Sequence, residues 1–213
     1  MRIGVIGSAI VGQTLAGGLK KHEYDVRIAS RTPDKLAAFS SKSGVPAAVP
    51  PAVAAWAEAL VLAVKGTAAE SALREAGESN INGKVVLDAT NPIANEPPDD
   101  GVLRFFTSPN ESLMERLQLA FPSVKFVKAF NSVSNQVMID PQFPGGKPTM
   151  FYCGNDPGAK ALVARIIESL GWEGADMGTA AAARAIEPLC QLYCIRGLTK
   201  NEWNKYAFHL LQR

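Results

Sequence analysis

Residues 2–12 read Arg-Ile-Gly-Val-Ile-Gly-Ser-Ala-Ile-Val-Gly, and this stretch decides the fold. Its first half is a short apolar run that ends at Gly7, as a buried strand does, and from Val11 on apolar residues recur at helical spacing. Gly7 and Gly12 match the first and last glycines of the G-x-G-x-x-G fingerprint, and Ala9 stands at the middle one. The pattern predicts a dinucleotide site, in which backbone N–H groups at the start of a helix face a pyrophosphate.

The second half of the fingerprint lies at the end of an expected strand, residues 25–29. Proteins that bind NAD usually carry Asp or Glu there, about 20 residues after the glycine turn, to hold the ribose 2′-hydroxyl. This chain has Ser30, Arg31 and Thr32 instead, followed by Lys35. Hydroxyls and cations suit a 2′-phosphate, and the guanidinium can pair with it or stack on adenine. The alternative is a solvated loop with routine basic residues, but the position favours NADP(H).

Apolar segments further along the chain alternate between the strand and the helix period. Expected strands lie at residues 45–49, 60–64, 84–88, 124–130, 149–153 and 173–177. This alternation predicts an α/β fold of the Rossmann, doubly wound type, with a mostly parallel sheet and a small C-terminal α/β lobe. We expect an NADP-binding domain over residues 1–133. Residues 134–213 would form the lobe that completes the acceptor site, unless the chain is one continuous domain.

Helix boundaries follow from capping signals. Ser108-Pro109-Asn110-Glu111 has the spacing of a capping box and predicts a helix start there, and Asp156-Pro157 predicts another. Two helices, near residues 180–196 and 200–211, are expected to finish the chain.

Polar residues follow three of the expected strands directly. Lys65 comes after residues 60–64, Asn91 after residues 84–88, and Asn131 with Ser132 after residues 124–130. Open α/β sheets bind ligands outside the carboxyl ends of their strands, so these residues are expected to line the crevice for a nicotinamide. For any one alone, an ordinary strand-end turn is an equal alternative.

The usual catalytic sets are missing from the sequence. His22 and His209 lie far apart, the cysteines Cys153, Cys190 and Cys194 have no CxxC spacing, and no metal site is expected. We therefore expect no catalytic acid–base residue. Hydride transfer between two bound cofactors requires proximity and alignment more than a general acid, so the absence fits such a reaction.

The composition of the chain limits the kinds of binding partner that can be expected. The formal net charge of +2 over 213 residues gives no reason to expect nucleic acid. No apolar stretch reaches the roughly 18 residues of a spanning helix, so no membrane contact is expected. An odd number of scattered cysteines favours a reducing, cytoplasmic location.

The chain resembles the NADPH-dependent reductases of the coenzyme F420 type, which are deazaflavin-dependent NADP oxidoreductases. It is also similar to the cytoplasmic reductase domain of the six-transmembrane metalloreductases. The segments that carry the resemblance are Met1-Arg2-Ile3-Gly4-Val5-Ile6-Gly7, Ser30-Arg31, Cys153-Gly154-Asn155-Asp156 and Ile186-Glu187-Pro188-Leu189.

The resemblance implies three groups of contacts to the cofactor. The pyrophosphate contacts fall on the backbone of Ser8, Ala9, Ile10 and Val11, the 2′-phosphate contacts on Ser30, Arg31 and Lys35, and the nicotinamide contacts on Lys65, Asn91 and Ser134. Two features depart from the family pattern: Ala9 replaces a glycine, and the segments at Asn91-Pro92 and Asn131-Ser132-Val133 are more polar than the deazaflavin pocket of the archaeal enzymes.

The leading hypothesis is an oxidoreductase that transfers hydride between NADP(H) and a deazaflavin or flavin acceptor. One alternative is an NADPH-dependent reductase of a small imine or carbonyl compound. Those relatives add a long helical C-terminal domain, whereas only residues 149–213 follow the Pro- and Gly-rich loop here. The other alternative is a non-catalytic NADPH-binding sensor. The family resemblance also implies a homodimer, and the partner expected otherwise is a small-molecule redox acceptor.

Overall fold

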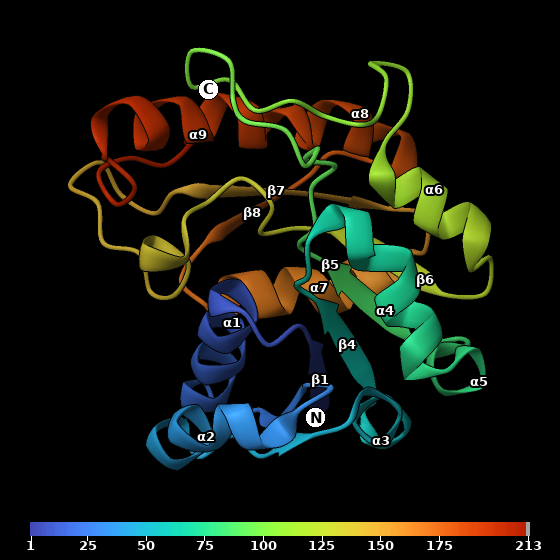
Figure 1. Cartoon of the computed structure of the whole chain (residues 1–213). Helices are drawn as coiled ribbons and strands as arrows, with labels where there is room; N and C mark the ends of the chain where they lie inside the picture. The colour runs from blue at the N-terminus through green and yellow to red at the C-terminus, as the bar shows by residue number, and fades with distance from the viewer. Residues whose placement is uncertain (212–213) are drawn as a thin grey trace.

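The computed structural model describes residues 1–211 (Figure 1). The strands are β1 (Arg2–Ile6), β2 (Asp25–Ala29), β3 (Ala47–Ala48), β4 (Ala59–Leu62), β5 (Val85–Asp88), β6 (Lys125–Lys128), β7 (Thr149–Gly154) and β8 (Glu173–Asp176). The α-helices are α1 (Ile10–Lys21), α2 (Ala37–Ser43), α3 (Pro50–Trp56), α4 (Ala69–Ala76), α5 (Glu78–Ile81), α6 (Leu113–Ala120), α7 (Pro157–Ser169), α8 (Ala183–Ile186) and α9 (Pro188–Lys200). Short 3-10 helices are η1 (Pro33–Leu36), η2 (Gly66–Ala68), η3 (Asn135–Val137) and η4 (Ala180–Ala182).

The strands form one sheet in the order β3-β2-β1-β4-β5-β6-β7-β8. All neighbours from β3 to β6 are parallel, β6 and β7 are antiparallel, and β7 and β8 are parallel again. The predicted mostly parallel, doubly wound sheet is confirmed. The strand order reverses between β1 and β4, and ligands of such sheets bind in the crevice outside the carboxyl ends of the strands at that point.

Each face of the sheet carries its own hydrophobic cluster. On one face, Leu15 and Leu19 of α1 and Val163 and Ile167 of α7 pack on the sheet. On the other face, residues of α3, α4, α6 and α8 form the second cluster, with Leu73 of α4 fully buried. Because both faces are covered, the central strands read as continuous apolar runs in the sequence.

A long loop joins β5 to α6 and runs beside α9 over the carboxyl end of the sheet, as the green and red segments of Figure 1 show. Gln191 of α9 donates its Nε2–H to the carbonyl of Leu103 at 2.7 Å, which attaches the loop to that helix. A side chain at Gly101, where φ is +82°, would meet Thr199 at 2.5 Å, so the tip of the loop lies close against the end of α9.

The prediction of a capping box at residues 108–111 is wrong. The capping box lies at residues 112–115, the next stretch with the same Ser-x-x-Glu spacing. The helix begins at Leu113, and Ser112 accepts a hydrogen bond from the backbone N–H of Glu115 while the Glu115 carboxylate accepts from Ser112. Residues 108–111 form a turn instead. The second Ser-x-x-Glu prevails because a buried carboxylate, that of Glu187, accepts from the N–H groups of Leu113 and of the residue after it, and so fixes the helix start.

The expected helix over residues 200–211 is also wrong. Asn201, in the left-handed conformation at φ 54°, closes α9, and the chain then turns back along that helix. The Trp203 ring lies on Gly197, where a Cβ would come within 2.3 Å of it, and the carbonyl of Phe208 accepts from the N–H of Thr149 in β7. An aromatic contact with α9 and a backbone hydrogen bond with β7 thus take the place of a helical repeat.

The helix start at Asp156 is confirmed, since its carboxylate accepts from the N–H of Ala159. Among residues 1–211, no helix has the length and apolar character that crossing a bilayer requires.

Candidate functional site

The turn between β1 and α1 requires glycine at two positions. Gly7 has φ +138°, and a Cβ there would lie 2.1 Å from the carbonyl oxygen of Ala63. A Cβ on Gly12 would lie 1.9 Å from the carbonyl oxygen of Gly7, so α1 can approach β1 only without a side chain. Ala9 is the N-cap residue of α1, with extended backbone and an exposed side chain. The first N–H groups of α1, which have no partner within the helix, face outward at this point.

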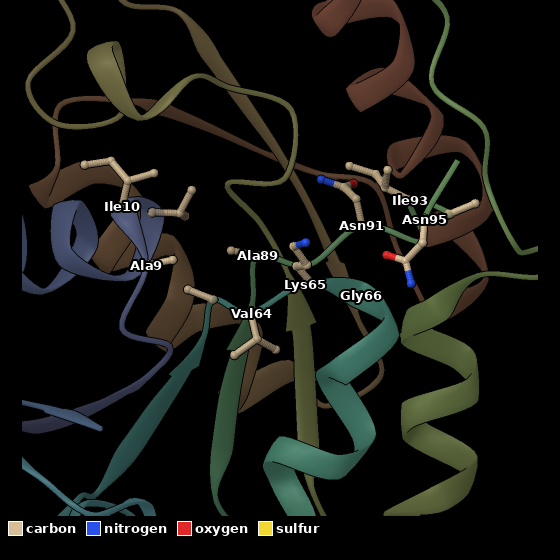
Figure 2. A pocket seen from close by; sticks show the side chains of 12 residues that line it. Ala9, Ile10, Val64, Lys65, Gly66, Ala89, Asn91, Ile93 and Asn95 are labelled. Atoms are coloured by element: carbon tan, nitrogen blue, oxygen red, sulfur yellow. The ribbon is translucent and has the colours of Figure 1, made fainter. Parts of the chain in front are cut away.

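A cavity of about 350 Å³ lies over this turn and is called the central cavity here (Figure 2). Figure 2 shows Ala9 and Ile10 at one side, Val64 and Lys65 below, and Asn91 opposite. The loop after β5 closes the far side. The structure thus brings together five of the predicted residues, from α1, the end of β4 and the end of β5. The full lining is Ala9, Ile10, Val11, Ala63, Val64, Lys65, Gly66, Ala89, Asn91, Ile93, Ala94 and Asn95.

A second cavity of about 170 Å³ lies on the other side of the glycine turn and shares Val64 with the first. Gly7, Ser8, Ser30 and Arg31 all contribute to this glycine-turn cavity. Ser30 is buried, and its Oγ accepts from the backbone N–H of Thr32 at 3.1 Å. Four of the predicted residues therefore surround one space at the ends of β1 and β2.

Five predicted residues lie outside both cavities, namely Thr32, Lys35, Asn131, Ser132 and Ser134. Asn131 and Ser132 are buried. Thr32 and Lys35 are exposed and belong to neither wall. Ser134 is buried, and its Oγ accepts from the N–H of Gln136, which makes it the cap of η3.

Two asparagines hold the ends of β5 and β6 together. Asn91 donates its Nδ2–H to the carbonyl of Asn131 at 2.7 Å, and Asn131 donates in return to Asn91 Oδ1 at 3.1 Å. Asn131 also donates to the carbonyl of Ile186 at 3.0 Å. The residue before it, Phe130, has φ 59° although it is large and buried, a conformation that costs about 1–3 kcal/mol and is concentrated at functional sites. Asn131 is linked to the cavity wall through Asn91.

A fully buried ionic cluster lies beneath these asparagines. The Lys128 ammonium is 2.7 Å from Asp88 Oδ2 and 3.0 Å from Glu187 Oε1, and it donates to the carbonyl of Thr90 at 2.7 Å. Glu187 also accepts from the first two N–H groups of α6. Burial opposes the charged form of Lys128, but attraction to the two carboxylates outweighs it and raises the pKa of Lys128 above its usual value. The cluster joins β5, β6, α6 and the start of α9.

The cysteines supply no reactive thiolate to the central cavity. Burial raises the pKa of Cys153 to about 12, so this thiol stays protonated at physiological pH. No cysteine, histidine or carboxylate belongs to the lining of the central cavity in the described chain, and Lys65 is the one ionisable side chain there.

Comparison with known proteins agrees with this geometry. Residues 2–92 match the family described as NADP oxidoreductase coenzyme F420-dependent. A crystal structure of a protein from Arthrobacter sp. FB24, assigned as an F420-dependent NADP-reductase, has a TM-score of 0.91 and 32% sequence identity, and each chain is covered in full. The chain belongs to the F420-dependent NADP oxidoreductase family. It is an NADP-dependent oxidoreductase, as the glycine turn and Arg31 predicted.

More distant relatives share part of their length with this oxidoreductase. The metalloreductase STEAP3 of Rattus norvegicus is 26% identical over 188 residues, which are 88% of this chain and 36% of that protein. The chain thus spans about a third of the length of this curated relative. A reductive aminase from Aspergillus terreus was solved in complex with NADPH and ethyl levulinate, and it has a TM-score of 0.67 and 19% sequence identity. The match covers 94% of this chain and 62% of the aminase chain, so the two proteins share the fold.

The sequence patterns do not predict several residues of the oxidoreductase site. Ile93 and Asn95 line the central cavity from an irregular loop, for which no periodicity exists to predict a direction. Asp88 and Lys128 carried a usable signal, because charges in adjacent apolar strands of a buried sheet need partners. The third member, Glu187, could not be found in that way, since its place depends on how α9 packs.

Proposed function

We propose that this oxidoreductase transfers a hydride from NADPH to a flat tricyclic acceptor, a deazaflavin or a flavin, in the central cavity. The observation that carries the proposal is the lining itself. Its walls are mainly apolar, with Ile10 and Val64 on one side and Ile93 on the other, and they hold no acid–base pair. Stacked rings need apolar walls and alignment, whereas reduction of an isolated carbonyl or imine usually needs a proton donor at the reacting atom.

The residues present fit NADPH as the donor. Free N–H groups at the start of α1 face outward because Gly7 and Gly12 leave the turn without side chains, so they can bind the pyrophosphate. Ser30 and Arg31 on the glycine-turn cavity suit the 2′-phosphate, with Ser8 beside them. Bound there, NADPH supplies the hydride from its nicotinamide ring. Thr32 and Lys35 lie outside this space and are proposed only as longer-range positive or polar neighbours.

The chain's own side chains orient the rings and exclude water. Ile10 is 60% exposed at the cavity mouth, which leaves its side chain available to cover a bound ring. Asn91, held in place by Asn131, offers amide groups to the carboxamide of the nicotinamide or to the polar edge of the acceptor. The Lys65 side chain supplies a positive charge, which stabilises the electron-rich reduced form of the acceptor.

The test compares acceptors at fixed NADPH, following the loss of nicotinamide absorbance. We expect turnover with 5-deazariboflavin or riboflavin and none with 1-pyrroline. Turnover with the imine alone would contradict the proposal and indicate a reductase of small imine or carbonyl compounds. NADPH binding without turnover of any acceptor would indicate a non-catalytic NADPH-binding sensor.

A further inference from the structure

A third cavity, of about 360 Å³, opens beside the central one and is called the outer cavity here. The two share Gly66, Ala94 and Asn95, so they lie next to each other. The outer cavity is further bounded by Thr67 of η2, by Glu70 of α4, and by the loop before α6 and α6 itself. Nothing in the transfer of the hydride uses it.

The central cavity is too small to hold a complete acceptor together with the nicotinamide. Its volume of about 350 Å³ lies near the lower end of the roughly 300–1,000 Å³ range of ligand sites, before either ring is placed. On one side the central cavity adjoins the glycine-turn cavity, which shares Val64 with it and which the adenosine half of NADPH would fill. On another side it adjoins the outer cavity, which shares Gly66 with it. The outer cavity is therefore the neighbouring space that remains for a substituent on the acceptor ring.

Gly66 lies in the wall that the two cavities share. A Cβ at Gly66 would lie 2.0 Å from the carbonyl oxygen of Asn91 and 3.0 Å from Leu113 Cδ2, so the loops after β4 and β5 pack directly against each other there.

The charges around the outer cavity are already compensated. The Arg116 guanidinium makes two hydrogen bonds to the Glu111 carboxylate, at 2.8 and 2.6 Å, and Glu70 accepts two from Arg74, at 3.1 and 2.8 Å. A phosphate or carboxylate would find no free cation there. Hydroxyl groups, in contrast, can donate to these carboxylates and accept from the guanidinium without disturbing either pair.

The rest of the wall of the outer cavity is uncharged. Thr67 and Asn95 are exposed and present a hydroxyl and an amide, and Phe106 adds an apolar surface over which Arg116 lies at 5.4 Å from the ring centroid. Short polar groups beside an aromatic face suit a chain of alternating C–H and O–H groups.

We propose that the outer cavity binds a neutral, hydroxylated chain carried by the acceptor ring, such as the ribityl chain of a flavin or deazaflavin. This inference rests on the proposed function. It adds a specificity site, because an acceptor without the chain would lose these contacts while its ring still stacks.

The test measures binding to the NADP⁺ complex by fluorescence titration, with two ligands that differ only in this chain: 5-deazariboflavin, and 5-deazalumiflavin, which has a methyl group in its place. The unmodified protein should bind the ribityl compound roughly tenfold more tightly, as one or two additional hydrogen bonds would provide. Thr67→Trp, at an exposed position on the cavity wall, should abolish that difference and leave the dissociation constant of the methyl compound unchanged. Thr67→Val should retain part of it.

Leu119→Trp serves as the matched control, because Leu119 is 85% exposed on α6 and lies outside the outer cavity. It should change neither dissociation constant. Equal affinity of the unmodified protein for the two ligands, or equal weakening of both by Thr67→Trp, would overturn the inference while ring reduction still supports the proposed function. If the methyl compound is neither bound nor reduced, the proposed function fails and the inference fails with it.

Discussion

At the scale of single residues, we propose that Arg31 determines the choice of coenzyme. It is the second residue after β2 and contributes to the glycine-turn cavity together with Ser30. Glu75 of α4 also belongs to that wall, so the space is not uniformly positive. Discrimination for the 2′-phosphate then depends on the guanidinium, which can bind two phosphate oxygens at once.

Arg31→Ala should weaken NADPH binding roughly tenfold, because a charge-assisted hydrogen bond at an exposed position is lost. NADH, which lacks the phosphate, should bind with an affinity changed by less than about twofold. Calorimetric titration with both nucleotides measures this. Lys42→Ala, at an exposed lysine in α2, is the control and should alter neither affinity. Equal losses for the two nucleotides would refute the assignment of Arg31.

At the scale of elements, the start of α6 shows what local patterns can and cannot predict. The spacing Ser-x-x-Glu occurs twice in succession, at residues 108–111 and 112–115, and local chemistry does not distinguish the two. The choice is made by Glu187, far along the chain, and by Arg184, which donates two hydrogen bonds to Glu115 Oε1 and one to Oε2. Tertiary partners of this kind lie outside any sequence window.

Glu115→Gln should lower the free energy of unfolding by about 1 kcal/mol at pH 7, through the weakened cap and the lost ion pair. The hydrogen bonds from Arg184 and then from Ser112 hold the pKa of Glu115 below its usual value. A carboxyl of this kind contributes stability above its unfolded pKa, about 4.3, and the contribution is lost as pH falls through the lower folded pKa.

The difference between Glu115→Gln and the unmodified protein should therefore shrink below about pH 4, as measured by urea unfolding at a series of pH values. Glu168→Gln, an exposed position on α7, is the control and should show no pH-dependent difference. A deficit that stays constant down to pH 3 would contradict the role of the Glu115 charge.

At the scale of the whole molecule, the strands and the crevice could be predicted from the sequence. The path of residues 201–211 and of the loop before α6, which cover them, could not. Gly7, Gly12 and the residues after β2 and β5 follow from periodicity and from the fingerprint, because each depends on its own stretch of chain. The path of residues 201–211 does not, since Trp203 and Phe208 find their partners on α9 and β7. The same limit applies to the loop before α6, which forms the outer cavity.

The buried ionic cluster of Lys128, Asp88 and Glu187 links α6 and the start of α9 to strands β5 and β6 of the sheet. Lys128→Met should lower the free energy of unfolding by about 3–5 kcal/mol, because Asp88 and Glu187 would remain buried without their cation. Chemical denaturation measures this. Adding Asp88→Asn and Glu187→Gln to the same protein should restore much of the loss, as no buried charge then remains unpaired. A cost below about 1 kcal/mol for Lys128→Met alone would show that the cluster is not the link between the layers.

Direct hydride transfer from NADPH to the acceptor ring is tested by following the hydrogen itself. NADPH deuterated at one face of the nicotinamide C4 is incubated with 5-deazariboflavin in ordinary water, and the reduced product is examined by mass spectrometry and NMR. A carbon–deuterium bond at C5 of the reduced deazaflavin does not exchange with water. Direct transfer between rings stacked in the central cavity predicts one deuterium at C5, from one of the two NADPH epimers alone. A reduced product without deuterium from either epimer would contradict the account.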